Sequence, residues 1–207
     1  MKTASVLLRL VSLTLGSLVF WVSSTFAATL PVQVMATDAV AGYPAAFRTS
    51  LINPGQAVRF VVEKPDHSVV QISAQADLEG VAKADFYGHQ TKVAGTYRVA
   101  VVYPGSSDAS PQASFKVYPD RVSASQSTLR STLQLVEVNS DATFLTATLY
   151  DAYRNPIEGH RVSLISSRSD DTITALQNGM TNAQGEASFK IKSRYAGFPC
   201  LPPSIQR

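Results

Sequence analysis

Apolar and polar residues alternate with a period of two along most of the chain from Pro31 onward. In the run Ala57–Lys64, for example, Val58, Phe60 and Val62 fall on one face of an extended chain. Such alternation, in runs rich in β-branched and aromatic residues, is typical of strands with one buried face. The pattern predicts strands over Ala57–Lys64, Gly95–Tyr103, Gln112–Tyr118, Thr143–Tyr150, Arg161–Ile165 and Glu186–Ile191.

Turn-forming residues separate these runs at short intervals. Gly, Pro, Asn and Asp cluster where the chain must reverse direction, as in Asn53-Pro54-Gly55, Tyr103-Pro104-Gly105, Asn155-Pro156 and Gln184-Gly185. No window of the sequence predicts an amphipathic helix longer than two turns. Many short strands with such spacing indicate an all-β protein, a sandwich or a barrel.

The strand pattern stops near Tyr118-Pro119-Asp120 and restarts after the polar stretch Ser123–Ser131. Pro119 cannot donate a backbone hydrogen bond to a sheet, and it favours an extended conformation of Tyr118. We therefore predict two tandem immunoglobulin-like β-sandwiches, residues 28–118 and 119–197, joined by a short and stiff connection. A single domain that wraps the whole chain is the alternative.

The first residues have the composition of a secretory signal. Lys2 and Arg9 precede the uncharged, mostly apolar run Leu10–Val22, and small residues follow up to Ala27. That run is shorter than the ~20 apolar residues of a typical membrane-spanning helix. We predict that residues 1–27 are a signal peptide, so that the remaining chain is secreted or held at the cell surface without a membrane span. An anchor that is not cleaved is the alternative.

Composition and charge exclude several classes of protein. Hydrophobic residues make up 45% and charged residues 16%, which is enough apolar material for a packed core. The net charge of +3 includes the two cations of the signal peptide and falls to +1 without them, so no strongly basic nucleic-acid-binding surface is expected. Cys200 is the only cysteine, and therefore the fold has no intramolecular disulfide.

Several turn motifs resemble one family. The segment from Arg121 to about Gly197 resembles a bacterial immunoglobulin-like domain of the invasin/intimin type, a family associated with adhesion. The residues that carry the resemblance are Leu145-Thr146-Ala147-Thr148-Leu149-Tyr150-Asp151, Asn155-Pro156-Ile157-Glu158-Gly159, Val162-Ser163-Leu164 and Thr181-Asn182-Ala183-Gln184-Gly185-Glu186-Ala187.

Each of these motifs has a physical interpretation. Asp151 and Asn155-Pro156 can build a turn that is stabilised by side-chain hydrogen bonds. Ile157 is expected to re-enter the core, and Gly159 is expected to relieve backbone strain before the next strand. Asn182–Gly185 is expected to connect a hairpin. The family often has Gly where this chain has Arg154.

The first sandwich resembles macroglobulin-type or other immunoglobulin-like sandwiches. The matching residues are Asn53-Pro54-Gly55-Gln56-Ala57-Val58 and Val93-Ala94-Gly95-Thr96-Tyr97-Arg98-Val99. Tyr97 follows a Gly turn, and it is either a tyrosine corner, with its hydroxyl bonded to upstream backbone, or an ordinary core residue.

The last ten residues, 198–207, depart from the family pattern. They contain Pro199, Pro202 and Pro203, which exclude a central strand. The second sandwich is therefore expected to be incomplete and to lack its closing strands. Either the chain is a fragment of a longer surface protein, or another chain donates a strand to the open edge of the second sandwich. Cys200, in this tail, is expected to be incidental.

A catalytic or metal-binding constellation is not predicted. The histidines His67, His89 and His160 are isolated from one another and from Cys, and neither a zinc motif nor a nucleophile motif occurs. Asp66-His67 is expected in a solvated turn. Asp85–His89 is a recognition surface or a strand end with Phe86 in the core. Asp170-Asp171 supplies too few oxygens for calcium. We predict no catalytic residue, no cofactor and no metal.

Two hypotheses about function follow. The first is a non-enzymatic exported module, a spacer or an adhesive part of a bacterial cell-surface protein that engages another protein or a surface ligand. The second is an accessory β-sandwich region of a larger exported enzyme such as a hydrolase. Fold alone does not decide between them.

Overall fold

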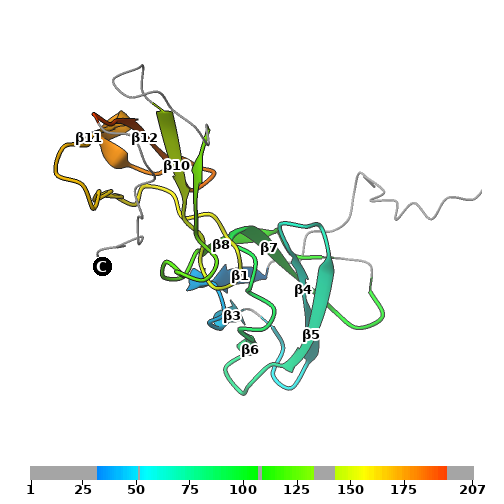
Figure 1. Cartoon of the computed structure of the whole chain (residues 1–207). Helices are drawn as coiled ribbons and strands as arrows, with labels where there is room; N and C mark the ends of the chain where they lie inside the picture. Colours follow the sequence, from blue (N-terminus) through cyan, green and yellow to red (C-terminus); the bar gives the residue numbers. More distant parts are fainter. Residues whose placement is uncertain (1–31, 51, 107–108, 133–142, 195–207) are drawn as a thin grey trace, which may run out of the picture.

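The computed structural model describes residues 32–50, 52–106, 109–132 and 143–194 (Figure 1). Within these ranges the protein is built of strands, with a single 3₁₀ turn, η1 (Leu176–Gly179), and no α-helix. The predicted all-β class is thereby confirmed. The predicted signal peptide, residues 1–27, and the proline-rich tail, residues 198–207, lie outside the described residues.

The first unit is a sandwich of two sheets. One sheet has three strands in the order β1-β3-β6, and the other has five strands in the order β2-β8-β7-β4-β5. Figure 1 shows β3 and β6 on one side of this unit and β4 and β5 on the other. The strands are β1 (Gln33–Ala36), β2 (Ala39–Val40), β3 (Ala45–Ser50), β4 (Ala57–Glu63), β5 (Val69–Gln75), β6 (Ala82–Phe86), β7 (Gly95–Val102) and β8 (Ala113–Tyr118).

Aromatic rings fill the space between these two sheets. Phe47 lies against three phenylalanine rings, with centroids 5.8, 5.6 and 5.3 Å away. The faces predicted from alternation are confirmed, because Val58, Phe60 and Val62 on β4 are buried. Ring pairs at these separations add stabilisation beyond their buried area. The rings of the core belong to Phe47, Phe60, Phe86, Tyr97 and Phe115.

Of the two roles considered for Tyr97, the structure shows the tyrosine corner. Its side chain is fully buried, and its hydroxyl donates a hydrogen bond to the carbonyl oxygen of Val93, four residues upstream, at 2.8 Å. Burial raises the pKa of the Tyr97 hydroxyl from 10.0 to about 12. The hydroxyl therefore stays protonated and holds the loop that precedes β7.

Replacing Tyr97 with phenylalanine should lower the free energy of unfolding by about 0.5–1.5 kcal/mol, because the hydrogen bond from the Tyr97 hydroxyl to the Val93 carbonyl is lost. The native chain should also lose stability as pH rises from about 10 to about 12, because tyrosine ionises at lower pH in the unfolded chain than in the folded one. Tyr97→Phe should flatten that alkaline loss. Urea unfolding at neutral and alkaline pH measures both effects, with Tyr87→Phe, at an exposed ring, as the control. Equal alkaline loss in the native chain and Tyr97→Phe would contradict the assignment.

The second unit presents one four-stranded antiparallel sheet, in the order β11-β12-β10-β9. Its core cluster consists of Leu145, Ala147, Ala187, Phe189 and Ile191, against which Leu129, Val162, Leu164 and Ile173 pack. The order matches the A-B-E-D sheet of constant-type immunoglobulin domains. The strands are β9 (Thr128–Ser131), β10 (Thr143–Thr148), β11 (Thr172–Ala175) and β12 (Glu186–Lys192).

Three sequence-based predictions need correction in the second unit. Arg161–Ile165 was expected to be a strand, but only Arg161 forms an isolated bridge, to Met180, and the rest of the segment has no strand beside it among the described residues. The polar stretch Ser123–Ser131 is not only a connection, because its end forms β9, whose polar residues lie at a sheet edge. Ile157 is half-buried and lies outside the core cluster.

Candidate functional site

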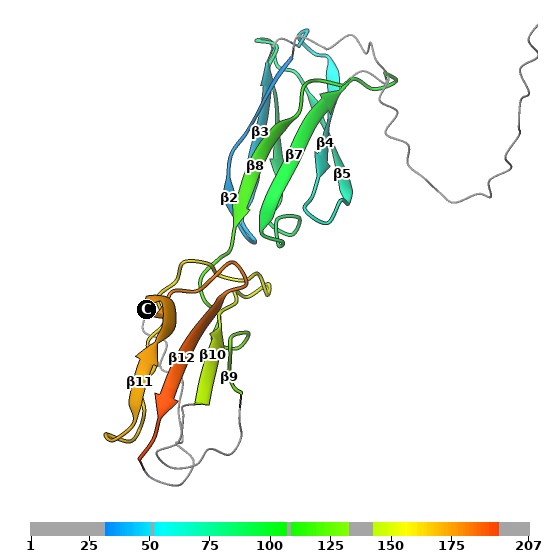
Figure 2. The same ribbon diagram turned by 90° about the horizontal axis from the view of Figure 1, so that it is seen from above.

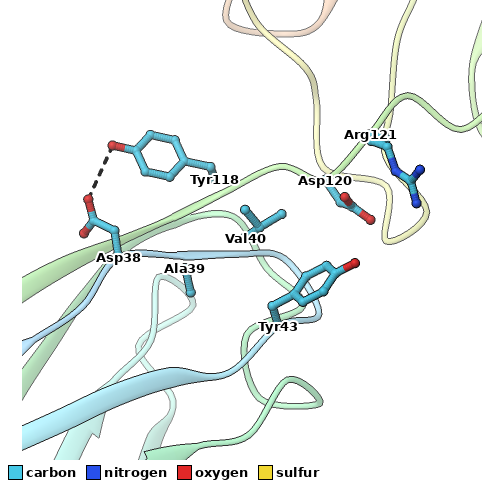
Figure 3. Close-up of a pocket in the computed structure, with 7 residues that line it drawn as sticks. All are labelled: Asp38, Ala39, Val40, Tyr43, Tyr118, Asp120 and Arg121. Carbon is cyan, nitrogen blue, oxygen red and sulfur yellow. Dashed lines mark hydrogen bonds between the residues drawn. The ribbon is translucent and has the colours of Figure 1, made fainter. Parts of the chain in front are cut away.

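The two units meet end to end, and the chain passes between them just after β8 (Figure 2). A shallow hollow of about 530 Å³ lies at this junction (Figure 3). It is open to solvent, and two of its tyrosines, Tyr43 and Tyr118, are 55% and 45% exposed. The residues that line the hollow are Asp38, Ala39, Val40, Tyr43, Tyr118, Asp120 and Arg121.

The short strand β2 positions one wall of the hollow. It runs parallel to the end of β8, with Val40 opposite Tyr118. Asp38 anchors the start of β2, because its carboxylate accepts a hydrogen bond from the backbone N–H of Lys116 at 2.7 Å. The Tyr118 hydroxyl lies 3.5 Å from the other Asp38 oxygen, and the Lys116 ammonium lies 5.0 Å from the Tyr118 ring centroid. The aromatic rings here are suited to contacts with a ligand, and the residues that line the hollow include no serine, threonine, cysteine or histidine.

A turn of the second unit, Asp151–Asn155, forms the other part of the junction. Asp151 is fully buried, and one of its carboxylate oxygens accepts hydrogen bonds from the backbone N–H groups of Tyr153 and Asn155, both at 2.8 Å. The other oxygen accepts from the Asn155 side-chain amide at 2.7 Å and from the Asp120 backbone N–H at 3.1 Å. The predicted side-chain-assisted turn is thereby confirmed, and it also holds the connection between the units.

Asn155 extends the same network across the junction. Its side-chain oxygen accepts a hydrogen bond from the backbone N–H of Ala94, and its amide donates to the carbonyl oxygen of Lys92, both at 2.8 Å. The side chain is 7% exposed, so water competes little for these bonds. Asn155 thus pairs with the first unit as a neighbouring strand would, through main-chain atoms alone on that side.

Tyr153 packs against the first unit beside this pair. Its ring centroid lies 5.9 Å from the Lys92 ammonium, and its hydroxyl lies over Gly42. A Cβ atom at position 42 would come within 2.2 Å of the Tyr153 hydroxyl oxygen, and Gly42 has a φ of +84°. The backbone conformation at position 42 therefore favours glycine, and any side chain there would also displace the Tyr153 ring.

The turn also explains the departure from the family at Arg154. This residue has a φ of +68°, in the left-handed region that glycine adopts without steric cost. The family's frequent Gly at this position fits the conformation, and the arginine here occupies it with strain. Asn182–Gly185 forms a turn in which the Asn182 side chain accepts hydrogen bonds from the backbone of Gln184 and Glu186. The hairpin expected there is not formed, because β12 pairs with β10 and β11, while Met180, just before the turn, bridges Arg161.

The other residues singled out in the sequence are separate from the junction network. His67 lies in an exposed turn, where its hydrogen bond to Glu63 at 3.0 Å lowers the pKa of that carboxyl. Phe86 is fully buried, whereas Tyr87 is 65% exposed and stacks on His89 with ring centroids 6.3 Å apart. His160 donates its backbone N–H to the Thr181 hydroxyl.

Asp171, one of the two acidic residues considered as calcium ligands, accepts a hydrogen bond from the Ser166 hydroxyl. Among the described residues, no three His, Cys, Asp or Glu side chains converge as metal ligands would. In the same part of the chain, no helix has the length and apolarity needed to cross a membrane.

The sequence did not reveal the first unit's part in the junction. The loop Lys92–Ala94 meets Asn155 through backbone atoms alone, and the residue types of a loop do not indicate what its backbone binds. Gly42 was the one usable signal, since a glycine can mark a close approach of two chain segments. The hollow likewise joins residues near 40 and near 120, which only the parallel pairing of β2 with β8 brings together.

Comparison with known proteins places the second unit in a family context. Residues 127–198 match the model of the bacterial Ig-like domain (group 1). No curated protein sequence matches the chain.

Two solved structures are similar to the chain. FdeC, an Escherichia coli adhesin, is 20% identical with a TM-score of 0.49, over 84% of this chain and 60% of that one. Salmonella alpha-2-macroglobulin reacted with methylamine is 14% identical with a TM-score of 0.35, over 81% of this chain and 13% of that one. The chain thus spans less than two thirds of the length of either protein. The match over residues 127–198 confirms the resemblance inferred from the turn motifs, and the second unit is similar to bacterial immunoglobulin-like domains of group 1.

Proposed function

We propose that this chain is an exported, non-enzymatic module of a bacterial cell-surface protein, in which two immunoglobulin-like sandwiches form a spacer with a fixed joint. The charge and apolar pattern of residues 1–27 supports export. The family match of residues 127–198 supports a module of the immunoglobulin-like kind and a place at the cell surface. Of the two roles expected from the sequence, spacer and adhesive part, the geometry of the joint favours the spacer.

The observation that carries the proposal is the side-chain network between the units. Asn155 makes two hydrogen bonds to the backbone of the first unit, and Asp151 binds the connecting segment through Asp120. A flexible linker would leave such groups to water, whereas these bonds are largely shielded from it. A spacer needs this property, because a fixed joint keeps distal parts of a surface protein at a constant distance from the cell.

The proposal is tested by measuring the distance between spin labels on the two units. Cysteines at the exposed positions Lys83, on β6, and Lys190, on β12, carry the labels in a full chain that also has Cys200→Ser. The native joint should give one narrow distance distribution. Asn155→Ala should broaden it, because the backbone of Lys92 and Ala94 then loses its partner.

Asn182→Ala is the matched control, since Asn182 also caps a turn of the second unit but bonds only within that unit. It should leave the distribution narrow. A broad distribution in the chain with an intact joint would refute the spacer with a fixed joint, and so would an unchanged distribution in Asn155→Ala.

A further inference from the structure

The segment Arg161–Ser166 crosses the second unit opposite its four-stranded sheet as an extended chain with an alternating pattern of exposure. Arg161, Ser163 and Ile165 are exposed, while Val162 and Leu164 are half-buried against the core cluster. This pattern is that of a strand with one buried face. Yet the segment is not part of any sheet among the described residues.

The hydrogen bonds at the start of the segment show which of its two edges is occupied. The His160 carbonyl oxygen accepts a hydrogen bond from the Thr181 backbone N–H at 2.9 Å. The Val162 backbone N–H donates a hydrogen bond to the Gly179 carbonyl oxygen at 2.8 Å. In an extended chain, successive residues direct their backbone groups to opposite edges. The backbone groups of Arg161, Ser163 and Ile165 therefore point to the other edge, away from Gly179.

That second edge is unoccupied within the described part of the chain. No hydrogen bond joins the backbone N–H or C=O groups of Arg161, Ser163 or Ile165 to any described residue. Three residues on one edge offer three donors and three acceptors, which is enough for a short ladder with an added strand. Exposed edges of this kind pair with extended peptides.

The side chains at the edge indicate the chemistry of that strand. Half-buried Val162 and Leu164 lie on the inner face, so a strand beside them gains by placing apolar residues at alternate positions. On the outer face Arg161 is exposed and forms no ion pair with a described residue. A carboxylate beside it would complement its charge, because opposite charges on neighbouring strands attract.

We infer that the edge formed by Arg161, Ser163 and Ile165 is an acceptor site for a strand of a partner polypeptide, with alternating apolar residues and an acidic residue beside Arg161. The partner strand adds main-chain hydrogen bonds to this edge and, together with the segment, forms a ladder opposite the four-stranded sheet. This inference is independent of the fixed joint, which involves other residues.

The test uses the full chain and a synthetic nine-residue peptide of alternating valine and threonine, with one threonine replaced by glutamate. Amide hydrogen exchange of Ser163 and Ile165 should be fast in the chain alone. At millimolar peptide the exchange rate of both amides should fall by at least about tenfold, because the added strand protects them. The same peptide with alternate backbone amides N-methylated cannot complete the ladder and should give no protection.

A charge exchange tests the chemistry of the partner. Arg161→Glu should favour a peptide with lysine in place of the glutamate. Arg130→Glu, the same change at an exposed position on β9, should keep the preference of the native chain for the acidic peptide.

Three results would overturn the inference. Slow exchange of Ser163 and Ile165 without peptide would show that the chain covers its own edge, or that a second copy covers it if the slowing grows with protein concentration. A peptide that protects neither amide, or protects β9 and β11 equally, would show that the edge is not a specific site. If Arg161→Glu still prefers the glutamate peptide to the lysine peptide, the proposed acidic residue of the partner strand is wrong.

Discussion

Replacing Asp151 with alanine is expected to destabilise the second unit by about 3–5 kcal/mol. The carboxylate accepts four hydrogen bonds, from the backbone of Asp120, Tyr153 and Asn155 and from the Asn155 amide, and alanine leaves all four donors without an acceptor. Each unsatisfied buried donor costs about 1–3 kcal/mol, and local relaxation recovers part of the sum. The loss should therefore exceed that of an ordinary surface substitution severalfold.

The measurement is urea unfolding followed by far-UV circular dichroism and by hydrogen exchange in β10 and β12. Asp170→Ala is the matched control, because it removes an exposed carboxylate of the same unit, and it should change stability by no more than about 0.5 kcal/mol. A loss below about 1 kcal/mol in Asp151→Ala would mean that water takes over the four donors.

Replacing Phe189 with alanine should cost about 3–5 kcal/mol and unfold the second unit while the first stays folded. The core cluster of the second unit has five buried residues, and Phe189 is the largest of them. The two core clusters share no residue, and the contacts between the units lie at one turn. Loss of the second core therefore leaves the aromatic core around Phe47 intact.

Residue-resolved hydrogen exchange distinguishes the two units. Amides of β4 and β7 should keep their protection in Phe189→Ala, while those of β10 and β12 should lose it. Phe144→Ala is the control, since Phe144 is 42% exposed and lies outside the core cluster. Simultaneous loss of protection in both units would contradict their independence.

The strands that the alternation predicted best lie inside the sheets. β4, β7, β10 and β12 each have neighbours on both sides and bury one face, which imposes the period of two on their sequences. Edge strands carry a weaker pattern. β9 and β11 have no fully buried residue, so their composition resembles that of a loop, and neither was predicted as a strand.

The junction was only half predictable for a related reason. Asp151 and Asn155 indicated a turn because their side chains serve nearby backbone groups. That Asn155 also binds the first unit depends on the tertiary position of Lys92 and Ala94, which are some 60 positions earlier in the chain. Conversely, Arg161–Ile165 has the pattern of a strand but belongs to no described sheet and forms only the bridge from Arg161 to Met180. Burial of one face sets the alternation whether or not the backbone is paired in a sheet.

Asn155 contacts the first unit through the backbone N–H of Ala94 and the backbone carbonyl of Lys92, and this has a consequence for which substitutions the junction tolerates. Because Asn155 binds only backbone atoms there, its two hydrogen bonds do not depend on the side chains at positions 92 and 94, although Lys92 also lies over the Tyr153 ring. What the contact with Asn155 and Tyr153 requires of the first unit is the path of one loop and the absence of a side chain at Gly42, over which the Tyr153 hydroxyl lies. A different sandwich with the same loop path would therefore offer Asn155 the same two hydrogen bonds.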